Sequence, residues 1–85
     1  MPYTIIISEK AVRELDSLPQ EIQKRMKEKL KVVRENPLHF FERLHGRLDF
    51  KLRVGDYRII ADIRESSSKI EITKVGHRKN VYQRH

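Results

Sequence analysis

Basic side chains lie close together on both sides of a Gly55-Asp56 pair. Lys51 and Arg53 precede the pair with one residue between them, and Arg58 follows it. Ammonium and guanidinium groups bind phosphate oxygens, and the planar fork of arginine can bind two oxygens at once. These three residues therefore predict an anion site whose chemistry suits phosphate.

A second group of side chains able to do chemistry lies in residues 75–82. His77, Arg78 and Lys79 are consecutive, and Tyr82 follows after two residues. Arg78 can add a guanidinium to the anion site, and the ring of Tyr82 can stack on a base or supply a phenol. The alternative is a basic tail whose tyrosine covers the edge of the core, and the residue types leave both interpretations open.

The charge of the 85-residue chain is distributed unevenly. Residues 1–42 contain eight Lys or Arg against seven Asp or Glu, a net of +1, whereas residues 43–85 contain eleven against five, a net of +6. A basic surface on one side of a protein is typical of proteins that bind nucleic acid. Solubility would also explain the total of +7, so both explanations stay open at this point.

Other kinds of site have little support in the sequence. The four histidines lack metal-ligand spacing, no cysteine is present, and the three glycines are scattered, so we expect no metal and no cofactor. The apolar run at residues 5–7 is too short for a signal peptide or a membrane span. We therefore expect one cytoplasmic domain over residues 1–85, with no membrane partner.

The elements that position these side chains begin with a strand and two helices. Residues 3–7 are rich in β-branched side chains, which predicts a strand, and Ser8 can cap a helix with apolar residues from 11 to 18. Residues 17–20 predict a second helix start, read as a capping box with Pro19 in the first turn. Apolar residues then recur at helical spacing until Asn36-Pro37 ends the helix.

A hairpin follows, and its turn sets which side chains face each other. Residues 48–54 and 57–63 alternate in polarity, and a glycine at the first position of a two-residue turn predicts type II′. This register places Arg53 opposite Arg58, and Lys51 opposite Ile60, and the three cations project from the face that does not carry Leu52 and Ile59. Facing like charges cost up to about 1 kcal/mol, which favours an anion site. The alternative is neutralisation by Asp49 and Asp62 on the same face.

The rest of the chain completes a small sheet. The three serines at residues 66–68 predict a turn, and residues 69–75 a third strand that Gly76 ends. The loop before the hairpin is expected to point Phe40, Phe41 and Leu44 inward. The predicted fold is α+β, with an N-terminal strand and a helical hairpin packed on one face of a small antiparallel sheet, and the other face open to solvent.

Four segments of the chain resemble the RelE/ParE superfamily of type II toxin–antitoxin toxins, and in particular its RelE-like branch. They are AVRELDSLP at 11–19, RLHGRLDFKLRVGDYR at 43–58, RVGDYRII at 53–60 and KVGHRKNVY at 74–82. The resemblance spans nearly the whole chain and implies the RelE-like microbial RNase-type fold. It also implies a ribosome-dependent endoribonuclease that cleaves mRNA in the A site and inhibits translation. The implied partners are the ribosome, mRNA and a RelB-like antitoxin in a hetero-oligomer.

The resemblance also implies roles for individual residues in a metal-independent attack by the ribose 2′-hydroxyl. Lys51 or Tyr82 would accept the proton, and Arg58 and Arg78 would stabilise charge on the phosphate. The RelE branch has two lysines spaced by one residue where this chain has Lys51 and Arg53. The implied catalytic set is Lys51, Arg58, Arg78 and Tyr82, and the implied RNA-binding set is Arg53, His77 and Lys79, with His77 also a candidate acid.

Three other functions stay open at this point. ParE-like members of the superfamily inhibit DNA gyrase on a very similar scaffold, so the fold does not decide between the two targets. A non-catalytic RNA-binding module would have the same basic surface. A degenerate toxin that retains only antitoxin binding is the third alternative.

Overall fold

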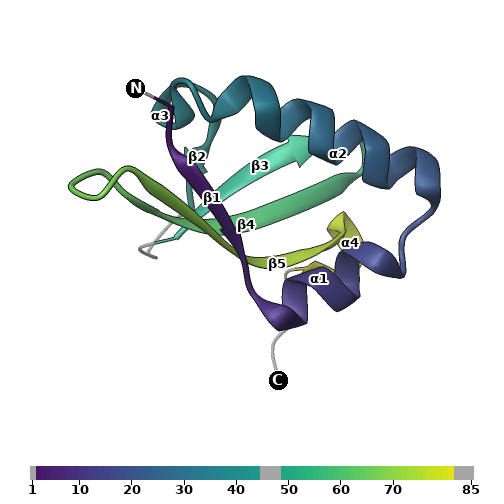
Figure 1. The fold of residues 1–85 in the computed structure, drawn as a ribbon. Helices are drawn as coiled ribbons and strands as arrows, with labels where there is room; N and C mark the ends of the chain where they lie inside the picture. The colour runs from purple at the N-terminus through teal and green to yellow at the C-terminus, as the bar shows by residue number, and fades with distance from the viewer. Residues whose placement is uncertain (1, 45–48, 82–85) are drawn as a thin grey trace.

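The computed structural model describes residues 2–44 and 49–81. Two helices cover one face of a five-stranded sheet, and a short helix lies on the other side (Figure 1). In chain order the elements are β1 (Thr4–Ile7), α1 (Glu9–Asp16), α2 (Gln20–Val33), α3 (Pro37–Phe40), β2 (Glu42–Arg43), β3 (Phe50–Val54), β4 (Tyr57–Arg64), β5 (Lys69–His77) and α4 (Arg78–Val81).

The strands form one sheet in the order β1-β5-β4-β3-β2. The β2, β3, β4 and β5 neighbours pair antiparallel, but β1 pairs parallel with β5, so the sheet is mixed rather than antiparallel as predicted. Because α1 and α2 carry the chain away from β1 before the hairpin begins, no tight turn forces β1 to run antiparallel to its neighbour. The α+β class and the helical hairpin on one face are confirmed.

The connection between α1 and α2 differs from the prediction in one detail. Ser8 caps α1 as expected, its side chain accepting a hydrogen bond from Ala11 N at 3.1 Å. The predicted capping box at residues 17–20 is wrong. The Ser17 hydroxyl donates to Glu14 O at 2.7 Å and closes α1, while Pro19 precedes α2 without a side-chain cap.

The core lies between the two long helices and one face of the sheet. Its members come from α1, α2 and the three central strands, with Phe41 from the connection that precedes β2. Of the three loop residues expected to point inward, Phe41 is buried and Leu44 is half-buried, but Phe40 is exposed and lies under the Lys29 ammonium group. The largest fully buried side chains are Met26, Ile59, Ile70, Ile72, Val33 and Pro37.

The β3–β4 turn has the predicted geometry. Gly55 has a φ of 59°, whereas Asp56 is not among the residues with positive φ, as a type II′ turn requires. The register is also as predicted, with Arg53 opposite Arg58 and Lys51 opposite Ile60.

The last strand, β5, is longer and less regular than predicted. It continues through Gly76 to His77 and contains a bulge, because Ile72 pairs with Ala61 while Lys74 pairs with Ile60, one residue along β4. The extra residue is Thr73, whose hydroxyl donates to Ile60 O at 3.3 Å. A glycine inside a strand often marks the close approach of another segment, and α4 follows directly after β5.

No helix within the described residues is both long and apolar enough to cross a membrane.

Candidate functional site

The sheet has an outer face, which we define as the face opposite α1 and α2. On this face two rows of side chains cross the strands near the β3–β4 turn. One row is Arg53, Arg58 and Gly76, and the next is Lys51, Ile60 and Lys74. We call the four cations in these rows the basic cluster: Lys51, Arg53, Arg58 and Lys74.

Arg58 holds the turn as well as carrying charge. Its Nη1 atom donates to Gly55 O and to Tyr57 O, both at 3.0 Å. The residue is only 8% exposed, and its Nε atom is buried without a hydrogen-bond partner in the described part of the chain. A buried cation with an unused donor is costly unless an acceptor reaches it, and an anion would supply one.

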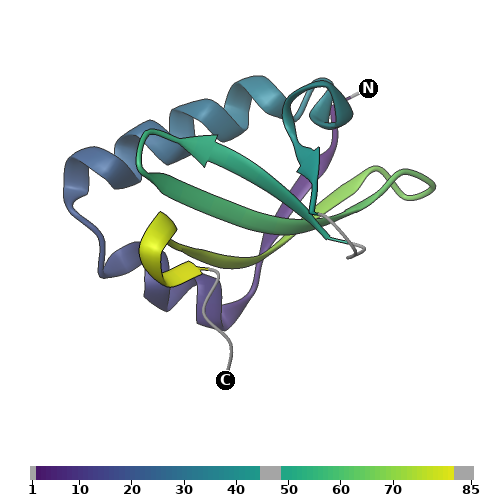
Figure 2. The same cartoon turned by 180° about the vertical axis from the view of Figure 1, so that it is seen from behind.

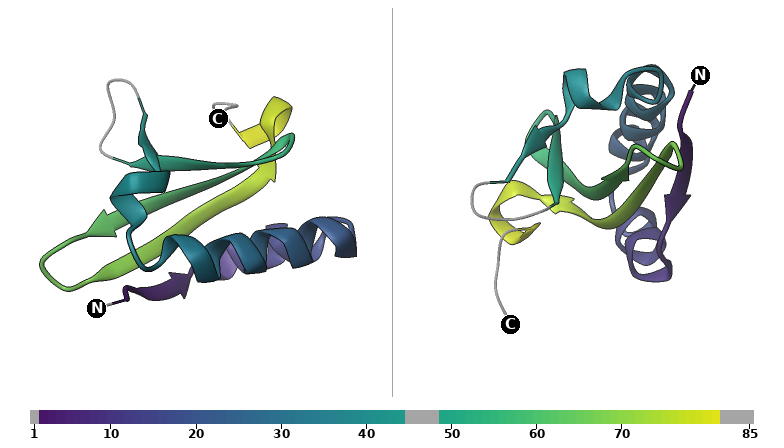
Figure 3. Two further views of the ribbon diagram at one scale, coloured as in Figure 1. Left: turned by 90° about the horizontal axis from the view of Figure 1, so that it is seen from above. Right: turned by 90° about the vertical axis from the view of Figure 1, so that its left-hand side faces the viewer.

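The short helix α4 covers part of the outer face. The Arg78 backbone N–H donates to Asp56 O at 2.9 Å, which ties the start of α4 to the β3–β4 turn. Figures 2 and 3 show α4 on the side of β4 and β5 away from α2. Both Arg58 and Ile60 are buried, so the prediction of a face open to solvent is wrong at this end.

Of the residues predicted near the carboxy terminus, two lie on α4, which begins at the β3–β4 turn, and one faces the helix-covered side. Arg78 and Lys79 are exposed on α4. His77 is opposite Tyr57, whose ring lies 5.2 Å from the imidazole and packs against the helix-covered core. His77 Nδ1 also accepts a hydrogen bond from Lys79 N at 3.1 Å. The predicted Tyr82 lies outside the described residues.

Carboxylates lie mainly in the rows farther from the turn. Asp62 is opposite Glu71, and Glu71 pairs with the Arg64 guanidinium. Within the described residues, neither Arg53 nor Lys74 has a carboxylate within ion-pair distance. Neutralisation by Asp62, which the sequence left open, therefore does not extend to those two cations.

Lys74 was not predicted as a site residue. Regular alternation from Ile70 and Ile72 would place it on the core side, but the bulge at Thr73 reverses the phase. The signal in the sequence is the apolar Val75, which breaks the alternation that Ile70 and Ile72 establish. Val75 is buried, and its N–H donates to Glu14 Oε1 at 2.9 Å, so α1 holds the shifted register in place.

Comparison with known protein families gives one match that covers most of the chain. The family described as the ParE toxin of the type II toxin-antitoxin system, parDE, matches residues 5–82. The chain belongs to the RelE/ParE toxin family. A comparison with curated protein sequences gives no match.

Solved structures similar to this toxin include RelE proteins in complex with their antitoxins. The RelBE2 complex from Mycobacterium tuberculosis is similar with a TM-score of 0.82 and 28% identity, over 91% of this chain and 99% of that one. The RelE–RelB complex from Pyrococcus horikoshii has a TM-score of 0.76 and 28% identity, over 94% and 99%. The Escherichia coli RelBE complex has a TM-score of 0.77 over 88% and 95%, and its 22% identity supports the fold alone.

The protein is therefore a type II toxin with a RelE-like fold. Its outer face brings Lys51, Arg53 and Arg58 together as predicted from the hairpin register, and adds Lys74 from β5. This arrangement can hold a polyanion and stabilise negative charge that develops on a phosphate.

Proposed function

We propose that this toxin is a metal-independent endoribonuclease that cleaves mRNA in the ribosomal A site, in the cytoplasm, and so inhibits translation. The observation that carries the proposal is Arg53 directly opposite Arg58 on the outer face, with a buried unused Nε donor on Arg58. A sheet gains nothing from two facing arginines, whereas a phosphodiester supplies acceptors for both. The 28% identical relatives solved as RelE proteins support the nuclease branch.

In this proposal the 2′-hydroxyl attacks the adjacent phosphorus and a 5′-oxygen leaves. Arg58 and Arg78 stabilise the added negative charge, and Lys51 or Tyr82 accepts the proton of the attacking hydroxyl. Arg53 and Lys79 hold the RNA backbone on either side. The ring of His77 faces Tyr57, so we propose that His77 acts on RNA binding indirectly. It would do so by positioning Lys79, whose N–H donates to His77 Nδ1.

The buried position of Arg58 also bears on why the ribosome is needed. We propose that a phosphate reaches the buried guanidinium when α4 shifts, since α4 has four residues and the Arg78 N–H ties it to the turn. Free RNA offers little binding energy for this shift. An mRNA held in place by the ribosome does not have to be positioned by the toxin, so we expect cleavage of free RNA to be weak.

We also propose a RelB-like antitoxin that forms a hetero-oligomer with this toxin. Similar structures from three organisms, Mycobacterium tuberculosis, Pyrococcus horikoshii and Methanococcus jannaschii, are complexes of RelE with RelB. An acidic antitoxin segment would neutralise the basic cluster and add buried surface to a small core.

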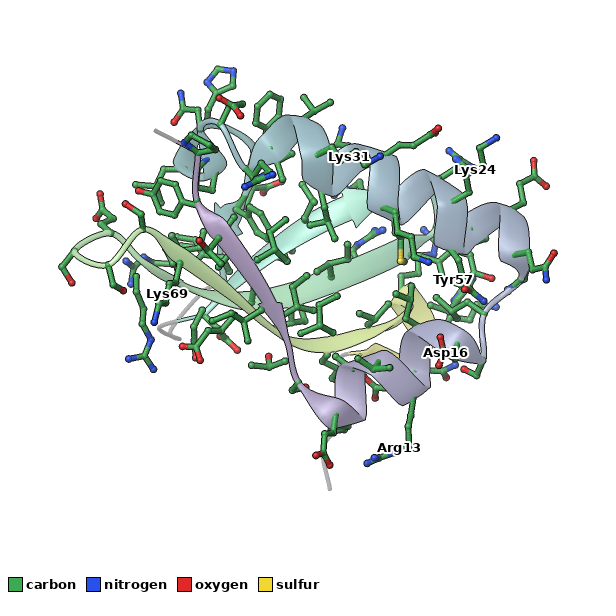
Figure 4. All side chains as sticks on the ribbon, viewed as in Figure 1. Arg13, Asp16, Lys24, Lys31, Tyr57 and Lys69 are labelled. Atoms are coloured by element: carbon green, nitrogen blue, oxygen red, sulfur yellow. The ribbon has the colours of Figure 1, made fainter. Side chains whose placement is uncertain are left out.

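Primer extension on a defined mRNA, with and without ribosomes, tests this proposal. The Arg53→Gln variant removes an exposed cation from the site. Lys69→Gln removes an exposed cation from the far end of β5 (Figure 4) and is the matched control. We expect new cuts that require ribosomes, are strongly reduced in Arg53→Gln and are unchanged in Lys69→Gln. A folded, antitoxin-free toxin that makes no cuts would refute the nuclease.

The description of the matched family supports a second candidate, because it names the ParE toxin rather than RelE. We propose inhibition of DNA gyrase as this alternative. A supercoiling assay discriminates, since a gyrase inhibitor blocks supercoiling and leaves mRNA intact. RNA binding that persists without either activity would instead indicate a non-catalytic module.

A further inference from the structure

We propose that Lys74 is an additional phosphate-binding position, and that the RNA backbone crosses the strands from β3 to β5 rather than following one strand. This inference rests on the proposed RNA substrate. It adds to the site a residue that regular alternation along the strand would have placed on the core side.

The bulge at Thr73 is what puts Lys74 on the outer face. Ile72 and Val75 both lie on the core side, three residues apart, so the residue between Thr73 and Val75 must point outward. Two hydrogen bonds fix this register, from the Thr73 hydroxyl to Ile60 O and from Val75 N to Glu14 Oε1. Lys74 is therefore held on the outer face by the backbone, and within residues 2–44 and 49–81 no salt bridge of its own contributes.

The row that contains Lys74 has the layout of a track for a polyanion. Lys51 and Lys74 flank the buried Ile60 on neighbouring strands, which places their Cα atoms about 10 Å apart. The row of Arg53 and Arg58 lies two residues away, at about 7 Å along the strands. Lys74 is half-buried and has no carboxylate within ion-pair distance among the described residues, so its charge is available to a ligand.

The direction of the row favours RNA over an acidic peptide. A peptide that joins the sheet pairs along an edge strand, β1 or β2, and its side chains follow that strand. The cations here come from three adjacent strands, β3, β4 and β5, each of which has a neighbour on both sides. A flexible backbone lying across the face can contact all three strands, with one phosphate near each cation.

Binding of a single-stranded RNA oligonucleotide with 2′-O-methyl groups, which cannot be cleaved, tests Lys74 apart from catalysis. Its affinity is measured by fluorescence anisotropy at several salt concentrations for the toxin and for Lys74→Gln, Lys74→Arg and Lys69→Gln. Each phosphate contact on a single strand contributes about 0.7 to the slope of log affinity against log salt. We expect Lys74→Gln to lower the slope by about 0.7 and the affinity about 5-fold at low salt. Lys74→Arg should restore both, and Lys69→Gln should change neither.

A slope for Lys74→Gln equal to that of Lys69→Gln, with both variants folded by circular dichroism, would overturn the inference. So would a loss of antitoxin affinity with unchanged RNA affinity, because it would assign Lys74 to an acidic protein partner. The lower slope in a toxin that makes no cuts on ribosomes would refute the nuclease and retain the Lys74 contact. Ribosome-dependent cuts by the toxin, together with an unchanged slope for Lys74→Gln, would support the nuclease and refute the Lys74 contact.

Discussion

The two faces of the sheet carry different kinds of side chain, although the same strands contribute to both. On the helix-covered face, the inward residues of β4 and β5 are almost fully buried apolar side chains, such as Ile59 and Ile72 at 1% exposure. On the outer face, the residues between them include the buried Arg58 and Ile60 and the half-buried Lys74. One face therefore supplies most of the stability of the fold, and the other carries charges such as those of Arg53 and Lys74, which have no ion pair within the described residues.

The magnitudes show why this division is tolerated. Full burial of one large apolar side chain stabilises a protein by about 1.5–3 kcal/mol, whereas a pair of facing like charges costs up to about 1 kcal/mol. A few core residues on the helix-covered face are enough to offset the repulsion between Arg53 and Arg58. Substitutions on the two faces should therefore separate stability from RNA binding.

The largest effect on stability is expected on the helix-covered face. Ile72→Ala removes a fully buried side chain between the helices and β5, and should lower the free energy of unfolding by about 2–5 kcal/mol. Urea denaturation measures this loss. Ile6→Ala is the matched control, since Ile6 on β1 is 40% exposed and its loss should cost much less. Equal losses in the two variants would contradict the comparison.

Arg58 belongs to both functions, so its substitution should affect both. Arg58→Ala is expected to reduce ribosome-dependent cleavage about 100- to 1,000-fold, because it removes a donor for the phosphate charge. It should also lower stability by about 1–2 kcal/mol through loss of the hydrogen bonds to Gly55 O and Tyr57 O. Thermal unfolding and primer extension on the same sample separate the two. Normal cleavage by the folded variant would remove Arg58 from the site.

A glycine substitution in the turn tests the link between backbone and site. Gly55→Ala should destabilise the toxin by about 1 kcal/mol, because φ there is 59°. An added Cβ would lie 3.6 Å from the Arg25 guanidinium, an ordinary contact, so the cost comes from the backbone alone. Asp56→Ala, the other turn residue, is the control. A Gly55→Ala variant with an unchanged melting temperature would exclude backbone strain at this turn.

The smallest and most informative effect concerns Arg53. Arg53→Glu replaces a facing like-charge pair by an opposite-charge pair, and should raise stability by up to about 1 kcal/mol. The same change should weaken RNA binding, measured by anisotropy. Arg53→Gln should give intermediate values of both. If stability falls with RNA affinity along this series, then the arginine supports the fold and the division between the faces is wrong.

The parts of the structure that could be predicted are those that local chemistry decides. Gly55 at the first turn position fixed the hairpin register and hence the pairing of Arg53 with Arg58, and Ser8 marked the start of α1. The bulge at Thr73, the parallel pairing of β1 and the burial of Arg58 all depend on contacts between segments distant in sequence. Glu14 on α1 holds Val75 on β5, a contact across 61 positions. From the sequence, the apolar Val75 indicates only that the alternation of β5 is interrupted, and it does not give the position of the bulge.

The bulge has a consequence for how this protein can change over evolutionary time. Thr73 divides β5 into two stretches, each with its own alternation: Ile70 and Ile72 face the core before the bulge, and Val75 faces it after the bulge, with Lys74 turned outward. Mutations at outward positions of the second stretch alter what the toxin presents to its target and leave the packing of Ile70 and Ile72 as it was. A lineage can therefore acquire a new target by changing a few residues near the end of one strand while it inherits the same core.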